Sequence, residues 1–134
     1  MIPSNFVTLD VLDKPHDECG VIGVYDPGDQ QASTVAFYGL FALQHRGQES
    51  AGIASGDGTQ LQYFTNMGLV SQAFRQEDLD RLKGHVAIGH TRYSTTGSSS
   101  LLNAQPMVSK SSTIELAVSH NGNVINAVEL RNRL

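Results

Sequence analysis

The single cysteine of this 134-residue chain, Cys19, stands at the head of the apolar run Gly20–Val24. The β-branched residues and glycines of that run predict a buried strand, because glycine lets a neighbouring backbone approach closely. A lone cysteine is most often a small buried hydrophobe, which is the first interpretation. The second is a nucleophile, which requires an activating base and donors for a developing oxyanion from elsewhere in the chain.

Three polar clusters could surround such a nucleophile, and each follows an apolar segment. Arg92 and Thr95 come after a predicted strand, where the guanidinium could bind a planar carboxylate or simply lie in solvent. Asn121 and Gly122 come after another, where a side-chain amide and a backbone N–H could stabilise an oxyanion or form an ordinary turn. Arg46–Gly47 follow an apolar helix and are typical of a helix C-terminus.

The elements that must position these groups follow from hydrophobic periodicity. Segment 32–43 is apolar on most sides at helical spacing, which predicts a helix buried against a sheet, with Asp29 available as its cap. Asn126 and Glu129 have the spacing of a capping box for a last helix. We expect strands at 19–24, 51–55, 61–65 and 86–89, a half-buried strand at 114–118, and short outer helices within 72–83.

Composition bounds the class of protein. The formal net charge of −4, with scattered basic residues, argues against a nucleic-acid surface. One cysteine and the lack of a signal-like or membrane-spanning run favour a cytoplasmic protein that does not contact membranes. The five histidines lack metal-ligand spacing, so no metal site is expected. Residues 1–18 have no sustained periodicity and form either a frayed terminus or a leader whose removal would free the α-amino group of Cys19.

Four motifs together resemble one family, in order and spacing. They are Cys-Gly-Val-Ile-Gly from Cys19, Leu-Gln-His-Arg-Gly-Gln-Glu-Ser-Ala-Gly-Ile from Leu43, Gly-His-Thr-Arg-Tyr-Ser-Thr-Thr-Gly from Gly89, and Ser-His-Asn-Gly-Asn from Ser119. These motifs are similar to those of the class II glutamine amidotransferases, over everything from Asp17 onward. The sequences His-Arg-Gly-Gln-Glu and Arg-Tyr-Ser-Thr within these motifs favour the branch whose ammonia acceptor is phosphoribosyl pyrophosphate over the hexosamine-forming branch.

The resemblance implies an α+β fold of the N-terminal-nucleophile hydrolase type, with two antiparallel sheets packed face to face and helices outside, incomplete at its C-terminus. It divides the chain into a leader, 1–18, and a truncated glutaminase domain, 19–134. After autocatalytic leader cleavage, the Cys19 thiol would attack glutamine with its own α-amine as general base, and Asn121 and Gly122 would hold the oxyanion. By the same resemblance, Arg92 and Thr95 would bind the substrate α-carboxylate, and Arg46 and Gly47 would shape the wall beside the nucleophile.

The resemblance also implies parts that this chain does not contain. Ammonia would pass to phosphoribosyl pyrophosphate in a C-terminal half, giving 5-phosphoribosylamine, the opening step of purine synthesis. That half would use Mg²⁺ and, in relatives with a leader, a [4Fe–4S] cluster that Cys19 alone cannot hold; this segment needs no cofactor. The complete protein would be a homo-oligomer. Two alternatives stay open: another class II amidotransferase such as the hexosamine-forming one, or an inactive, unprocessed fragment that only binds glutamine.

Overall fold

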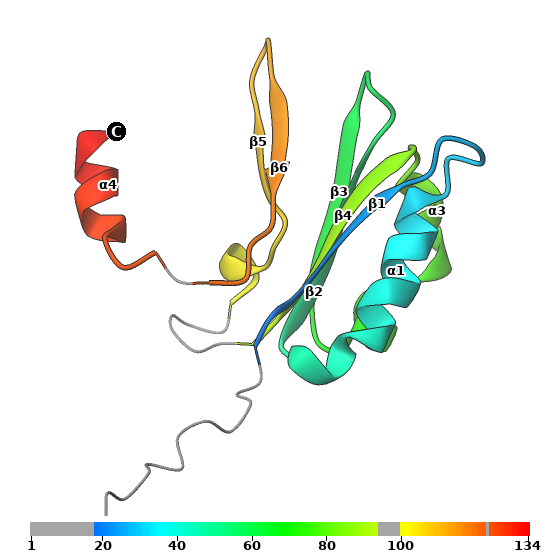
Figure 1. The fold of residues 1–134 in the computed structure, drawn as a ribbon, viewed down its shortest axis with the longest axis horizontal. Coiled ribbons are helices and arrows are strands. Elements are labelled where there is room, and N and C mark those ends of the chain that lie inside the picture. The colour runs from blue at the N-terminus through cyan, green and yellow to red at the C-terminus, as the bar shows by residue number, and fades with distance from the viewer. Residues whose placement is uncertain (1–17, 94–99, 123) are drawn as a thin grey trace, which may run out of the picture.

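The chain forms two antiparallel sheets with helices on their outer sides (Figure 1). The computed structural model describes residues 18–93, 100–122 and 124–134. One sheet has four strands in the order β1-β4-β2-β3, and the other pairs β5 with β6. The strands are β1 (Gly20–Tyr25), β2 (Ser50–Gly56), β3 (Leu61–Met67), β4 (Val86–Arg92), β5 (Met107–Lys110) and β6 (Glu115–Val118). The helices are α1 (Ala32–Ala42), α2 (Val70–Ala73), α3 (Gln76–Arg81) and α4 (Ala127–Arg133), with short 3₁₀ turns η1 (Gln44–Arg46) and η2 (Leu101–Asn103).

A hydrophobic core lies between α1 and one face of the four-stranded sheet. Leu40 of α1 and Ile53 of β2 are fully buried in it, and each such side chain contributes about 1.5–3 kcal/mol through burial. Gly39 lets α1 approach β1, because a Cβ there would overlap the side chain of Ile22. The prediction of a helix buried against a sheet is confirmed, since Ala36 and Leu40 of α1 are fully buried. The other side of α1 is apolar but exposed, and Tyr38 there is 67% exposed.

The central strand β2 is covered on both faces, which explains its run of small residues. Its residues from Ser50 to Ser55 are all buried. On the face away from α1, the chain at Gln105 crosses directly over Gly52, where a Cβ would lie 2.2 Å from the Gln105 carbonyl oxygen. Gln105 precedes a cis peptide bond to Pro106 and leads into β5. Small residues in β2 therefore allow the second layer to lie against the first.

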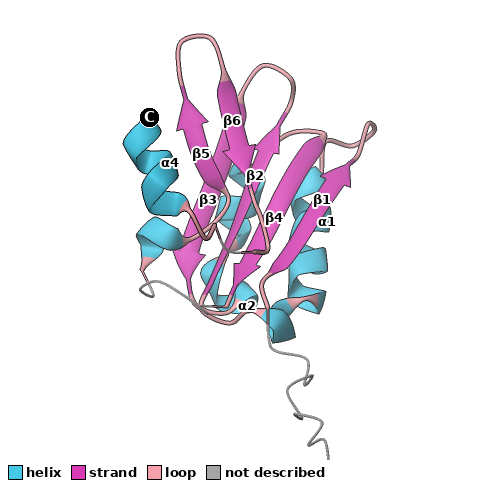
Figure 2. Cartoon of the chain, turned by 60° about the vertical axis from the view of Figure 1, so that its left-hand side comes forward, coloured by secondary structure: helices cyan, strands magenta, loops and turns pink. Residues whose placement is uncertain are grey.

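The layers run helix, sheet, sheet, helix, with α1 on one outer side and α4 on the other (Figures 1 and 2). These observations confirm the predicted fold class. Strand 114–118 alternates as predicted, but its apolar side chains are its exposed ones: Leu116 and Val118 are half exposed, whereas Ala117 is partly covered. Because Ala117 lies on the opposite face of the strand, the small side faces the four-stranded sheet and the large side faces outward.

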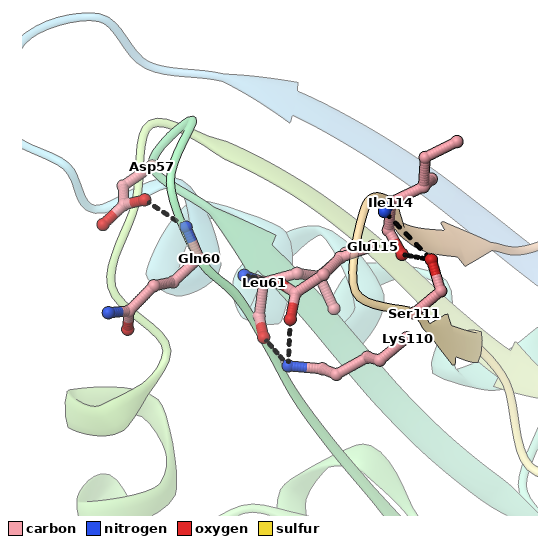
Figure 3. A network of polar contacts seen from close by, with 7 residues as sticks. All are labelled: Asp57, Gln60, Leu61, Lys110, Ser111, Ile114 and Glu115. Atoms are coloured by element: carbon pink, nitrogen blue, oxygen red, sulfur yellow. Dashed lines mark hydrogen bonds and ion pairs between the residues drawn. The ribbon is translucent and has the colours of Figure 1, made fainter.

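A polar clamp joins the far ends of the two sheets (Figure 3). A carboxylate oxygen of Glu115 accepts a hydrogen bond from the backbone N–H of Leu61 at 2.7 Å, and Lys110 lies 3.2 Å from the other oxygen. Lys110 also donates to the carbonyl oxygen of Leu61. In the neighbouring turn, a hydrogen bond from the Thr59 hydroxyl and backbone bonds from Gln60 and Thr59 lower the pKa of Asp57 to about 2.

Three local predictions need correction. Asp29 does not cap α1; the carboxylate of Asp26 instead accepts from the backbone N–H of Gln31, the residue before the helix. Asn126 makes no side-chain cap bond to α4, and Glu129, the other residue of the predicted capping box, pairs with Arg133 at 2.8 Å. Strand β1 is not buried throughout, because it is an edge strand of its sheet. Across the described ranges, no helix combines the length and apolarity needed to cross a membrane.

Candidate active site

Cys19 lies directly before β1, and the pairing of β1 with β4 fixes its surroundings. Gly20 pairs with Thr91, so the sulfur of Cys19 meets the chain leaving β4. Its Sγ atom lies 3.4 Å from the backbone nitrogen of Tyr93, which donates to it, and 3.5 Å from the carbonyl oxygen of the same residue. Cys19 is only partly exposed, and it is not a buried hydrophobe.

The turn η1 brings Arg46 to the backbone of Cys19. The Nε of Arg46 donates to the Cys19 carbonyl oxygen at 3.5 Å. Gly47 follows in extended conformation and is buried against the end of β4. A Cβ at Gly47 would lie 2.7 Å from backbone atoms of Thr91 and Arg92, and the Thr91 hydroxyl donates to the Gly47 carbonyl oxygen. Gly47 thus lets the segment carrying Arg46 lie flat against the strand that carries Arg92.

Asn121 reaches the same place from the second sheet. It follows β6, and its side-chain amide donates to a carboxylate oxygen of Glu18 at 3.3 Å. The same oxygen of Glu18 lies 3.6 Å from Arg46 Nη2. Gly122 has open space around it, with nothing within 4 Å of the position that a Cβ would take. The two predicted oxyanion donors therefore lie at the surface next to the segment Glu18–Cys19.

The backbone before Asn121 is anchored by two side chains. Nε2 of His90 lies 3.2 Å from the carbonyl oxygen of His120, and the side-chain oxygen of Gln105 accepts from the His120 N–H at 2.8 Å. His90 is fully buried, and burial lowers its pKa to about 4, outweighing the opposite effect of the His120 carbonyl. Among the residues that the structure describes, none is a hydrogen-bond partner of its Nδ1. His90 is therefore neutral at physiological pH and acts as a fixed donor to the loop that carries Asn121.

Arg92, the last residue of β4, is the remaining described candidate residue of the site. It is 8% exposed. Because side chains alternate along a strand, Arg92 lies on the same face of β4 as His90, and Thr91 lies on the opposite face. Its backbone carbonyl accepts from the N–H of Glu49 at 3.1 Å, and β4 pairs it with Ser50. Thr95, the other residue predicted to bind a carboxylate, lies outside the described residues, as does most of the predicted leader.

The structure thus brings Cys19, Arg46, Gly47, Arg92, Asn121 and Gly122 to one end of the sheets. Sequence reasoning missed Glu18, which it assigned to a leader outside the core, although an acidic residue directly before a candidate nucleophile was a usable signal. It also gave no role to His90, which it only rejected as a metal ligand together with the other histidines. Within the described ranges, no group of three or more His, Cys, Asp or Glu side chains could hold a metal ion.

Comparisons with known proteins identify relatives over most of the chain. An amidophosphoribosyltransferase of Synechococcus elongatus is 49% identical over 142 residues, covering 100% of this chain and 29% of the relative. One from Mycobacterium tuberculosis is 51% identical over 123 residues, covering 91% and 23% respectively. One from Methanocaldococcus jannaschii is 49% identical over 116 residues, covering 87% and 25%. No family model matches the chain.

Two solved structures share the fold. A structure of the allosteric regulatory enzyme of purine biosynthesis matches with a TM-score of 0.77 and 40% identity over 84% of this chain and 24% of that one. A glutamine phosphoribosylpyrophosphate amidotransferase from Bacillus subtilis, complexed with ADP and GMP, matches with a TM-score of 0.74 and 39% identity, with the same coverage.

The fold and motifs are those of the N-terminal-nucleophile glutamine amidotransferases, which confirms the family resemblance. Within that class, the chain is homologous to part of the amidophosphoribosyltransferases, the branch that the motifs favoured over the hexosamine-forming one. The chain spans between 23% and 29% of the length of these relatives.

Proposed function

We propose that this chain is the glutaminase part of an amidophosphoribosyltransferase. In this proposal, Cys19 becomes the first residue once the leader 1–18 is removed, and its thiolate attacks the side-chain amide of glutamine. A Cys19 thioester forms as ammonia leaves, and water then releases glutamate. The hexosamine-forming alternative is less well supported, since the relatives described above are amidophosphoribosyltransferases. The other alternative, an unprocessed fragment that only binds glutamine, is separated from the proposal by the experiment below.

One observation carries the proposal. The Cys19 sulfur accepts from Tyr93 N–H, while Arg46 and Asn121 arrive from two other segments within hydrogen-bond or ion-pair distance of Glu18–Cys19. A nucleophile, an amide donor and a guanidinium from separate elements are what acyl transfer from a small amino-acid substrate requires.

The proposal gives each residue the role that the family resemblance implies. The free α-amine of a processed Cys19 would have a pKa of about 7.7–8.0, so it could take the thiol proton and return it to the leaving ammonia near neutral pH. While Glu18 remains attached, that nitrogen is an amide and cannot act as a base. The Asn121 amide and the Gly122 N–H would bind the oxyanion, and Arg92 with Thr95 would bind the α-carboxylate of glutamine.

The proposal extends to the complete protein, in which ammonia would be transferred to phosphoribosyl pyrophosphate to form 5-phosphoribosylamine. The Mg²⁺ and [4Fe–4S] cluster implied by the resemblance would belong to the remainder of that protein. This chain supplies one cysteine, so it does not offer the four thiolates that such a cluster takes, and no step here depends on either group. The homo-oligomeric state and the cytoplasmic location stay predictions.

Intact mass and a glutaminase assay on the full-length protein test the proposal. We expect a mass that lacks residues 1–18 and release of ¹⁵N-ammonia from amide-labelled glutamine. Cys19→Ala should retain the leader and abolish the release, and Asn121→Ala in the processed protein should lower turnover about 100- to 1000-fold. Glu129→Ala, far from Cys19 in sequence and exposed on α4, serves as the control. Unchanged ammonia release by Cys19→Ala would remove the nucleophile assignment.

A further inference from the structure

The residue immediately before the expected cleavage point occupies the candidate site. One oxygen of the Glu18 carboxylate accepts from the Asn121 amide at 3.3 Å and lies 3.6 Å from Arg46 Nη2. These partners come from the loop after β6 and from η1, 103 and 28 residues away along the chain. Two distant segments therefore meet on the carboxylate of the residue that directly precedes Cys19.

The chemistry of Glu18 matches that of the substrate in the proposed function. Its side chain has the same length as that of glutamine and ends in a carboxylate in place of the amide, so it has the shape of the product glutamate. Its oxygen takes the hydrogen bond from the amide nitrogen of Asn121, the group that would otherwise stabilise the oxyanion. The Asn121 N–H that points at the Glu18 oxygen cannot at the same time point at a glutamine carbonyl oxygen.

We propose that Glu18 is an internal occupant of the glutamine site, holding the Asn121 amide and Arg46 until the Glu18–Cys19 bond is cut. This inference rests on the proposed function. Hydrolysis of that bond adds one water across it, leaving a carboxylate on Glu18 and an amine on Cys19. One cut thus creates the general base and removes the occupant, so the chain cannot have a freed amine and a tethered occupant together.

The strength of the contacts that Glu18 makes decides whether Glu18 can leave the site after cleavage. The side chains of Glu18 and Arg46 are 57% and 38% exposed, and exposed pairs of this kind are weak. Such contacts compete with a free ligand only while the chain holds Glu18 beside its partners at a high effective concentration. After cleavage the tether is gone, and the same weak contacts no longer retain Glu18 against glutamine.

Glutamine binding to an uncleavable protein tests the inference. In the full-length protein with Cys19→Ala, the leader stays attached, and adding Glu18→Ala should tighten the calorimetric Kd for glutamine about 1.5- to fivefold, the range expected for exposed polar contacts. Glu18→Gln, which can still accept from Asn121, should tighten it less. Glu129→Ala in the same Cys19→Ala background removes a comparable exposed pair with Arg133 and should leave the Kd unchanged. Equal affinities with and without the Glu18 carboxylate would overturn the inference.

A second protein separates this inference from the proposed function. Deletion of residues 2–18 places Cys19 directly after the initiator methionine, whose removal yields the processed form. If that form hydrolyses glutamine while Glu18→Ala leaves binding unaltered in the Cys19→Ala background, the occupant role alone is wrong. If it does not hydrolyse glutamine although thermal unfolding is cooperative, the proposed function itself fails.

Discussion

Nε2 of His90 lies 3.2 Å from the carbonyl oxygen of His120, the residue before Asn121. A carbonyl can only accept, so the proton of the neutral imidazole is on Nε2 and Nδ1 is unprotonated. The contact joins the buried centre of the four-stranded sheet to the loop that presents the candidate oxyanion donor. His90 is therefore a positioning residue for Asn121, and its protonation state has consequences for stability.

His90 should make the protein less stable in mild acid. Burial lowers its folded-state pKa from 6.5 to about 4, so this contribution is fully present above pH 6.5 and is lost as the pH falls toward 4. The loss should be on the order of 3 kcal/mol. Urea unfolding between pH 7.5 and 4.5 checks this, with His45→Gln as an exposed control.

His90→Gln keeps an N–H donor but cannot titrate, and His90→Leu removes the donor. We expect the first to lose the pH dependence and keep most glutaminase activity. The second should lower turnover because the loop carrying Asn121 loses its anchor. Identical pH dependence of wild type and His90→Gln would show that another group causes the acid destabilisation.

Arg92 should make the protein prefer glutamine over an analogue that lacks the α-carboxylate. Charged hydrogen bonds contribute about 1.5–3 kcal/mol, so wild type should prefer glutamine over its α-carboxamide analogue, in kcat/KM, by about tenfold or more. Arg92→Ala should raise the KM for glutamine and abolish that preference, and Arg92→Lys should retain part of it. Because Arg92 is buried, the melting temperature of each variant is measured alongside. An undiminished preference in Arg92→Ala would exclude a carboxylate contact.

Gly47→Ala should destabilise the protein by steric overlap. The added Cβ would lie 2.7 Å from backbone atoms of Thr91 and Arg92, which cannot rotate away as a flexible side chain could. We expect a loss of about 1–3 kcal/mol in the free energy of unfolding, measured by urea denaturation. Gly23→Ala is the matched control, because nothing lies within 4 Å of its added Cβ. Equal stability of the two variants would contradict the close approach at Gly47.

The clamp between Glu115 and β3 should be visible in a carboxyl titration. The Leu61 N–H is the main cause of the lowered pKa of Glu115, and Lys110 contributes second. NMR titration should therefore place the Glu115 midpoint below 4.5, and Lys110→Ala should restore only part of the difference. Since the folded-state pKa is the lower one, the clamp stabilises the fold above the usual glutamate pKa and is lost in stronger acid. A complete return to the usual value in Lys110→Ala would assign the effect to the ion pair instead.

Much of this architecture could be predicted from local pattern. Strands β2, β3 and β4 lie where alternating or continuous apolar runs placed them, and the polar clusters around Arg46, Arg92 and Asn121 do fall at element ends. What the pattern could not supply was long-range pairing. Nothing in the sequence says that β4 lies between β1 and β2, and the role of Glu18 depends on partners from two distant segments.

Predictions from local sequence also failed where more than one residue could form the same hydrogen bond or ion pair. Asp26 and Asp29 could each accept from the first N–H groups before α1, and the turn geometry selects Asp26. Glu129 could bond back toward Asn126 or forward to Arg133, and it pairs with Arg133. In β6 the alternation predicted which residues share a face. It could not predict which of the two faces is buried, because that depends on which side of the strand the other sheet covers.

In the proposed function, the pairing of Gly20 with Thr91 also decides which peptide bond is cut, because the register of β1 fixes the position of Cys19. Strand residues advance about 3.3 Å each, so a slip by one position would carry the Cys19 sulfur beyond reach of Tyr93 N–H and turn every β1 side chain to the opposite face. A slip by two would restore the faces but double the displacement. The proposed nucleophile is thus selected by its distance from a ladder of backbone hydrogen bonds, so we expect a longer or shorter chain ahead of Glu18 to leave that selection unaltered.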